Sequence, residues 1–132
     1  MSNKLAFIVD DSQQYLSNQV KEIMESWGFQ NSEYKTVFEW KPGIANVSLL
    51  FGKTKAIHLD LSDTNNLNKF VDFIKDDEKN KKTLDNSNWY GVGLIITTTK
   101  AKGIKKIEQL ITKNKGLFIK KRKPEELKEE IK

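Results

Sequence analysis

Residues Ala56-Ile57-His58-Leu59-Asp60-Leu61 decide the fold of this chain. The run is short and mostly apolar, and a polar turn follows it from Ser62, which is the pattern of a strand buried on both faces. Gly52 separates the run from an apolar tripeptide, Leu49-Leu50-Phe51. The strand has an evident place in a core, whereas the tripeptide has no obvious core role. It is a candidate contact with a partner protein, and the alternative is a short helix packed on the sheet.

Strand-like and helix-like segments alternate on both sides of this run. Short apolar strands are expected over residues 6–9, 33–40, 56–61, 92–99 and 117–119. Amphipathic helices are expected over 16–27, 67–74 and 104–111, with a further helix opening at Pro124. The alternation predicts a single α/β domain over residues 1–132, an open three-layer αβα fold with a mostly parallel sheet of about five strands.

Three local signals refine this prediction. Gly28 is expected to end the first helix. Alternation along residues 33–40 places Tyr34, Thr36, Phe38 and Trp40 on one face of a strand. The polar residues 75–90 are expected to form a mobile loop.

The composition limits the class of protein. The chain has 132 residues, no cysteine and a formal net charge of +5. Without cysteine there is no disulfide or thiolate metal site, and a reducing cytoplasm is the natural setting. No apolar run reaches the length of a membrane span, so no membrane contact is expected.

The positive charge is concentrated in the last third of the chain. From Lys100 onward there are 12 Lys and Arg against 5 Glu. Such a surface attracts nucleic acid or an acidic protein, although a lysine-rich solvated surface gives the same pattern. The candidate basic contact surface consists of Lys100, Lys102, Lys105, Lys106, Lys120, Lys121, Arg122 and Lys123.

Three carboxylates follow predicted strands. Asp10 and Asp11 come after the first strand and Asp60 closes the third, so they meet at one edge of a parallel sheet and would suit Mg²⁺. With Ile8-Val9-Asp10-Asp11-Ser12 and Lys123-Pro124, the pattern resembles the receiver domain of two-component response regulators. That resemblance implies that Asp60 is a phosphoacceptor. The alternative is that Asp10 and Asp11 only cap a helix.

Two further motifs do not support catalysis. Gly52-Lys53-Thr54 looks like the end of a phosphate-binding P-loop, but Val47 stands where the motif needs its first glycine, and a strand follows instead of a helix. His58 lies inside a strand and is the only histidine, so neither histidine-based catalysis nor a histidine metal site is indicated. We therefore expect no cofactor and no intrinsic catalysis.

The region around the tripeptide resembles the N-terminal domain of the bacterial DNA polymerase III delta subunit, the clamp-loader subunit that acts as a wrench on the sliding clamp. Ser48-Leu49-Leu50-Phe51-Gly52-Lys53-Thr54-Lys55 and the strand at Ala56-Ile57-His58-Leu59 follow the family's order of an apolar tip, a glycine, basic residues and a strand. The later helix, polar gap, strand, lysine-rich helix and short strand also follow that order.

The resemblance implies a P-loop-like fold without a functional P-loop or ATP hydrolysis, and a role in DNA replication. It implies that Leu49, Leu50 and Phe51 bind the sliding clamp, with Leu50 and Phe51 entering its hydrophobic pocket. It further implies contacts of the basic last third with DNA or other clamp-loader subunits. The receiver-like phosphoacceptor and a basic nucleic-acid-binding adaptor remain the alternatives.

Overall fold

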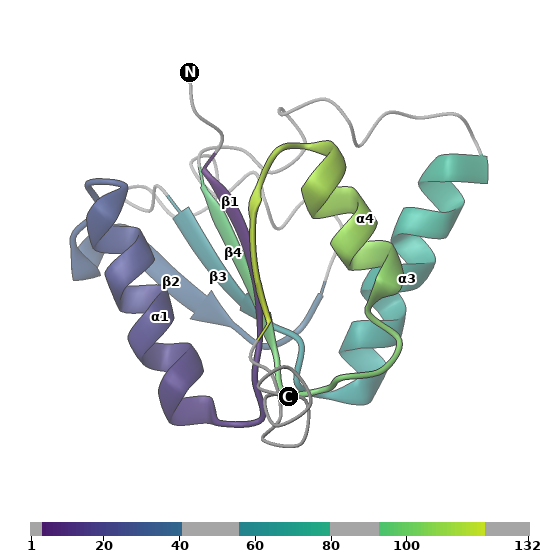
Figure 1. Cartoon of the computed structure of the whole chain (residues 1–132), viewed down its shortest axis with the longest axis horizontal. Helices are drawn as coiled ribbons and strands as arrows, with labels where there is room; N and C mark the ends of the chain where they lie inside the picture. The colour runs from purple at the N-terminus through teal and green to yellow at the C-terminus, as the bar shows by residue number, and fades with distance from the viewer. Residues whose placement is uncertain (1–3, 41–55, 80–92, 121–132) are drawn as a thin grey trace, which may run out of the picture.

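The computed structural model describes residues 4–40, 56–79 and 93–120. These residues form an α/β fold with a five-stranded sheet in the order β2-β3-β4-β1-β5, in which every neighbouring pair is parallel (Figure 1). The strands are β1 (Leu5–Val9), β2 (Tyr34–Val37), β3 (Ala56–Asp60), β4 (Leu94–Thr98) and β5 (Leu117–Lys120). The prediction of an α/β fold with about five mostly parallel strands is confirmed.

Three helices and one short 3₁₀ turn connect the strands within the described residues. They are α1 (Gln13–Ser26), η1 (Asn31–Glu33), α3 (Thr64–Lys79) and α4 (Lys105–Lys113). Helix α1 connects β1 to β2, which lies at one edge of the sheet. The chain then adds β3 and β4 in order between β2 and β1, and β5 lies on the other side of β1, at the opposite edge. The central strands β1, β3 and β4 are therefore buried along their whole length, as apolar parallel strands are.

The sheet separates two apolar clusters because successive side chains of a strand point to opposite faces. On one face, Ala6 and Ile8 of β1 pack with Leu16, Val20 and Met24 of α1. On the opposite face the strands pack with α3 and α4, and Figure 1 shows these two helices lying next to each other there.

Two glycines occupy turns that follow helices, one because of its backbone conformation and the other because of a close approach to β1. Gly28 has a φ of +89°, a conformation in which a side chain is strained, and its N–H donates to the carbonyl of Glu25 at 2.9 Å. A Cβ on Gly116 would lie 2.9 Å from the carbonyl oxygen of Leu5, so only glycine allows the α4–β5 turn to approach β1 this closely. The predicted helix stop at Gly28 is confirmed.

Trp40 lies on a different face from the one that strand alternation predicts. Strand β2 ends at Val37, and beyond it Trp40 is buried in the cluster under α3, with its ring centroid 4.6 Å from that of Phe70 and 5.0 Å from that of Phe73. The backbone N–H of Trp40 donates to Oδ1 of Asn66 at 3.1 Å. Side chains alternate between the two faces of a sheet only while the strand continues, and β2 ends before Trp40. Packing against the rings of Phe70 and Phe73 therefore decides the face on which Trp40 lies.

Helix α3 is longer than its apolar stripe predicts. It continues to Lys79, so residues 75–79 of the expected polar loop are helical. The remainder of that loop, residues 80–90, and the helix expected from Pro124 lie outside the described residues.

Candidate functional site

The predicted clamp-binding tip cannot be placed. Leu49, Leu50 and Phe51 lie outside the described residues, between β2 and β3. What the structure does place is the strand that follows them. β3 begins at Ala56, lies between β2 and β4, and is buried along all five residues.

The basic contact surface is described in part. Lys100, Lys102, Lys105 and Lys120 are exposed and Lys106 is half-buried, whereas Lys121, Arg122 and Lys123 lie outside the described residues. The amphipathic pattern of α4 explains this arrangement. Its apolar residues Ile107, Leu110 and Ile111 are buried against the sheet, so its lysines face away from the core.

The described charges are strongly segregated along the chain. Residues 93–120 contain seven lysines against the single acidic residue Glu108, whereas residues 4–40 and 56–79 contain six lysines against twelve Asp and Glu. The last described third therefore carries a net positive charge and the rest a net negative one. A positively charged surface of this kind attracts anionic groups, although a lysine-rich solvated surface gives the same pattern.

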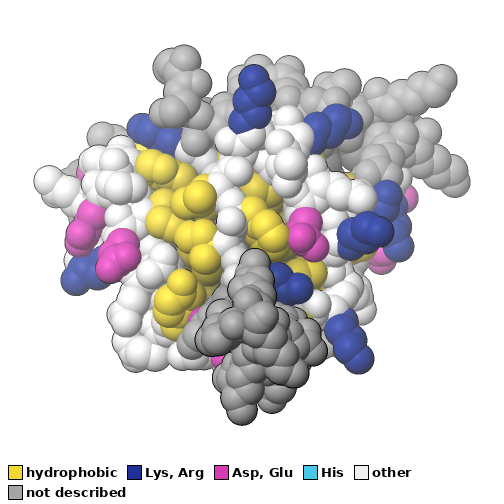
Figure 2. Space-filling view, in the orientation of Figure 1, with side chains coloured by type: hydrophobic (Ala, Val, Ile, Leu, Met, Phe, Trp, Pro, Cys, Tyr) yellow, Lys and Arg dark blue, Asp and Glu magenta, His cyan; other side chains and the backbone are white. Residues whose placement is uncertain are grey.

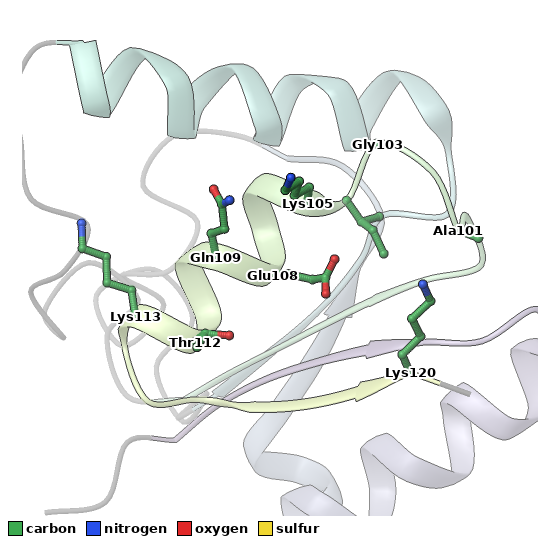
Figure 3. A pocket seen from close by; sticks show the side chains of 9 residues that line it. Ala101, Gly103, Lys105, Glu108, Gln109, Thr112, Lys113 and Lys120 are labelled. Atoms are coloured by element: carbon green, nitrogen blue, oxygen red, sulfur yellow. The ribbon is translucent and has the colours of Figure 1, made fainter. Parts of the chain in front are cut away.

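A shallow hollow of about 630 Å³ lies on the exposed side of α4 (Figure 3). Lys105, Lys113 and Lys120 stand around it, and Figure 3 shows the side chains of Glu108 and Lys120 extending into the space between α4 and the end of β5. The remaining lining residues are Ala101, Gly103, Ile104, Gln109 and Thr112. With three lysines and one glutamate, the hollow suits a phosphate or carboxylate group of a larger partner.

Hydrophobic side chains gather beside the edge strand β5. Figure 2 shows two groups of them on this side of the molecule, one toward α1 and one toward α4. Ile119 packs against the cluster under α1 and Phe118 against the cluster under α4, while Leu117 is 47% exposed. Leu117 and Phe38, which is 66% exposed, are the large exposed hydrophobic residues of the described chain.

The three aspartates do not converge on one cation. Asp10 is buried and its Oδ1 accepts from the N–H of Ser12 at 3.1 Å, while Asp11 is exposed. Asp60 is also buried, and its Oδ1 accepts from the N–H of Ser62 at 2.9 Å. Among the described residues, which include all three aspartates, no group of three acidic, histidine or cysteine side chains is placed to hold a metal ion.

A chain of hydrogen bonds that the sequence did not predict crosses three strands on the α1 face. Nδ1 of His58 lies 3.1 Å from Oγ1 of Thr36, and Nε2 of His58 lies 2.7 Å from Oγ1 of Thr97. Thr97 Oγ1 in turn donates to Oδ2 of Asp60 at 3.2 Å. The Thr97 hydroxyl has one hydrogen and donates it to Asp60, so its oxygen accepts from Nε2–H of His58. Nδ1 of His58 therefore carries no hydrogen and accepts from the hydroxyl of Thr36.

Burial controls the protonation of His58. The residue is 7% exposed, and its desolvation lowers the pKa from 6.5 to about 4, against the smaller opposite effect of the Asp60 carboxylate. His58 is therefore a neutral imidazole at physiological pH. The signal that could have revealed this network is strand register, since Thr36 pairs with His58 and Asp60 pairs with Thr97.

Comparisons with protein-family models, with curated proteins and with solved structures find no match to this chain. Within the described part of the chain, none of the helices has the length and apolar character needed to cross a bilayer.

Proposed function

We propose that this chain is a non-catalytic sliding-clamp-binding module of a DNA polymerase III clamp loader, acting in cytoplasmic DNA replication. In this proposal Leu50 and Phe51, with Leu49 beside them, enter the hydrophobic pocket of the clamp. Other clamp-loader subunits and DNA are its further partners, the latter through the basic surface on α4 and β5.

The observation that carries the proposal is the position of β3. The resemblance calls for a strand directly after the apolar tip and its basic residues, and β3 starts five residues after Phe51 as a fully buried interior strand. A short apolar tip gives useful affinity when a rigid element holds it and when its side chains are desolvated in a pocket. An interior strand is such an element.

The proposal also assigns the finer architecture, a three-layer αβα fold that is P-loop-like but has no functional P-loop. The packing of α1 on one face and of α3 and α4 on the other supports the layers. The residues between β1 and α1 support the lack of a phosphate loop. Asp10, Asp11 and Ser12 include no glycine, and the Ser12 hydroxyl caps α1 by accepting from the N–H of Tyr15 at 3.2 Å.

Two observations favour this proposal over a receiver-like phosphoacceptor. The strand order β2-β3-β4-β1-β5 differs from the 2-1-3-4-5 order of flavodoxin-like receiver folds. In addition, Asp60 is 4% exposed, and both of its carboxylate oxygens accept hydrogen bonds within the domain. A phosphoacceptor needs a carboxylate oxygen that a phosphodonor can reach, and very little of the Asp60 side chain is exposed.

The decisive experiment measures binding of the purified chain to purified bacterial sliding clamps by surface plasmon resonance. The double substitution Leu50→Ala with Phe51→Ala is expected to weaken binding at least 100-fold, since two pocket anchors each contribute about 2 kcal/mol or more. The matched control is Phe38→Ala with Leu117→Ala, which removes two exposed hydrophobic side chains elsewhere and should leave clamp binding unchanged. Clamp binding that survives the first pair, or no binding by the unsubstituted chain, would overturn the proposal.

A further inference from the structure

A groove of about 340 Å³ runs between α1 and β2 on the α1 face of the sheet. This volume lies at the lower end of the range for small-molecule sites. The groove is lined from α1 by Gln13, Ser17 and Val20, from β2 and the residue after it by Tyr34, Thr36 and Phe38, and from β3 by His58 and Asp60. None of these residues lines the basic hollow on α4.

The floor of the groove is fixed before any ligand arrives. His58 and Asp60 are 7% and 4% exposed, and the hydrogen bonds through Thr36 and Thr97 hold their side chains in one arrangement. Gln13 at the α1 side is held as well, because its Nε2 donates to Oγ of Ser62 at 3.0 Å. A preorganised polar floor lowers the cost of ordering that a ligand would otherwise have to overcome.

Phe38 lines the groove with a side chain that is largely exposed. Its side chain is 66% exposed, although the neighbouring residues Val37 and Trp40 both pack into the core. Fold stability does not explain this placement, since an exposed ring contributes little to a core. Beside the buried floor, the ring offers an apolar and aromatic surface to a bound molecule.

The charged residues that line the groove favour a ligand of positive charge. Among the described residues that line it, Asp60 carries the formal charge, and none is lysine or arginine. His58 adds no positive charge, because burial lowers its pKa to about 4. Tyr34 stays protonated, since burial and then the charge of Glu25 raise its pKa above 10.0.

We propose that this groove binds a small organic cation, an ammonium, amidinium or guanidinium group joined to an apolar body. The cation lies toward the carboxylate of Asp60, which can accept more than the two hydrogen bonds it already receives, and toward the hydroxyl oxygens of Ser17 and Thr36. The apolar body rests on the ring of Phe38, where a cation–π contribution adds to the attraction. This site is independent of the clamp-binding proposal.

The test titrates the full chain with benzamidine, a planar aromatic amidinium, and follows chemical shifts of His58 and Thr36 by NMR. Benzoate is the matched control ligand, because it has nearly the same shape and the opposite charge. Benzamidine is expected to shift both residues in a saturable way, and benzoate is expected to shift neither. Equal binding of the two ligands, or no saturable shift with benzamidine, would overturn the proposal.

Two variants locate the binding. Phe38→Ala should weaken benzamidine about 2- to 5-fold, the change that corresponds to a cation–π contact of 0.5–1 kcal/mol. Leu117→Ala removes the other large exposed hydrophobic residue, at the opposite edge of the sheet, and should change nothing. Equal effects of the two substitutions would show adventitious binding to exposed hydrophobic side chains and would reject the site.

Asp60→Asn removes the charge and nearly keeps the shape, so benzamidine should bind roughly 10-fold more weakly or worse. Because Phe38 is exposed, its variant keeps the proposal testable if Asp60→Asn does not fold. Leu50→Ala with Phe51→Ala should leave benzamidine binding unchanged, so failure of the groove and failure of the clamp proposal are separate results. An effect of that pair on benzamidine would contradict the assignment to this groove.

Discussion

On the face covered by α3 and α4, Trp40, Phe70 and Phe73 pack ring against ring, whereas on the face covered by α1 a line of polar side chains crosses the strands. The first face gains its stability from burial of apolar area, which has no fine directional requirement. The second face depends on hydrogen bonds that all have to be made, because each buried polar group left without a partner is costly. One sheet thus has a face that stabilises the fold and a face with the chemistry of a binding site.

The largest effect is expected from Phe70→Ala on the aromatic face. The side chain is fully buried and its ring contacts those of Trp40 and Phe73, so its loss leaves a cavity and should lower the free energy of unfolding by about 3–5 kcal/mol. Urea denaturation measures this change. Phe38→Ala is the control and should stay within about 0.5 kcal/mol. If the two losses were equal, the α3–α4 face would not be the stabilising one.

Acid should act on the polar face through His58. Its pKa is about 4 in the folded protein and near 6.5 when the chain is unfolded, so between these values the unfolded state binds a proton that the folded state does not. The free energy of unfolding should therefore fall as the pH drops from 6.5 to 4, by roughly 3 kcal/mol from this group. Above pH 6.5 His58 is neutral in both the folded and the unfolded state, so none of this stability is lost there.

Denaturation curves measured between pH 7 and pH 4 check this prediction, with His58→Gln as the comparison. The variant lacks the imidazole, so its free energy of unfolding should fall less steeply over the same interval. Parallel pH profiles for the two proteins would mean that His58 is accessible to water in the fold.

A smaller loss is expected from Thr97→Val, which keeps the shape of the side chain and removes the hydroxyl. Oδ2 of Asp60 and Nε2 of His58 would both lose this partner, at a cost of about 1–3 kcal/mol. Thermal unfolding measures the loss, and Thr36→Val, at the exposed end of the same chain of hydrogen bonds, should cost less. A neutral Thr97→Val would show that the network contributes no stability.

The smallest effect concerns the end of α1, the described helix that covers the polar face. Gly28→Ala places a side chain at a φ of +89° and should cost about 1 kcal/mol, measured by urea denaturation. Lys21→Ala on the exposed side of α1 is the control, with an expected change below about 0.5 kcal/mol. If Gly28→Ala were neutral, the turn after α1 would tolerate another backbone conformation.

The prediction from sequence was best where a signal is local and repeated. Ile8, Ile57 and Ile96 lie in buried strands as their apolar runs indicate, and the stop at Gly28 follows from the backbone freedom of glycine. It failed at Trp40, where a strand ends and distant aromatic rings decide the face. It also missed the role of His58, because a lone histidine in a strand gives no sign of the threonines that pair with it.

The alternation of buried strands and amphipathic helices can be predicted from the sequence alone, because hydrophobic periodicity depends only on residues close together along the chain. The uneven charge is also evident from the sequence, since Lys100 to Lys120 are close together along the chain. The strand order depends on long-range packing and is known only from the folded structure. The same holds for the contacts that it creates among Thr36, His58, Thr97 and Asp60. The hydrogen-bonded side chains of this network lie 22 to 39 residues apart along the chain, and no local preference specifies which strands become neighbours.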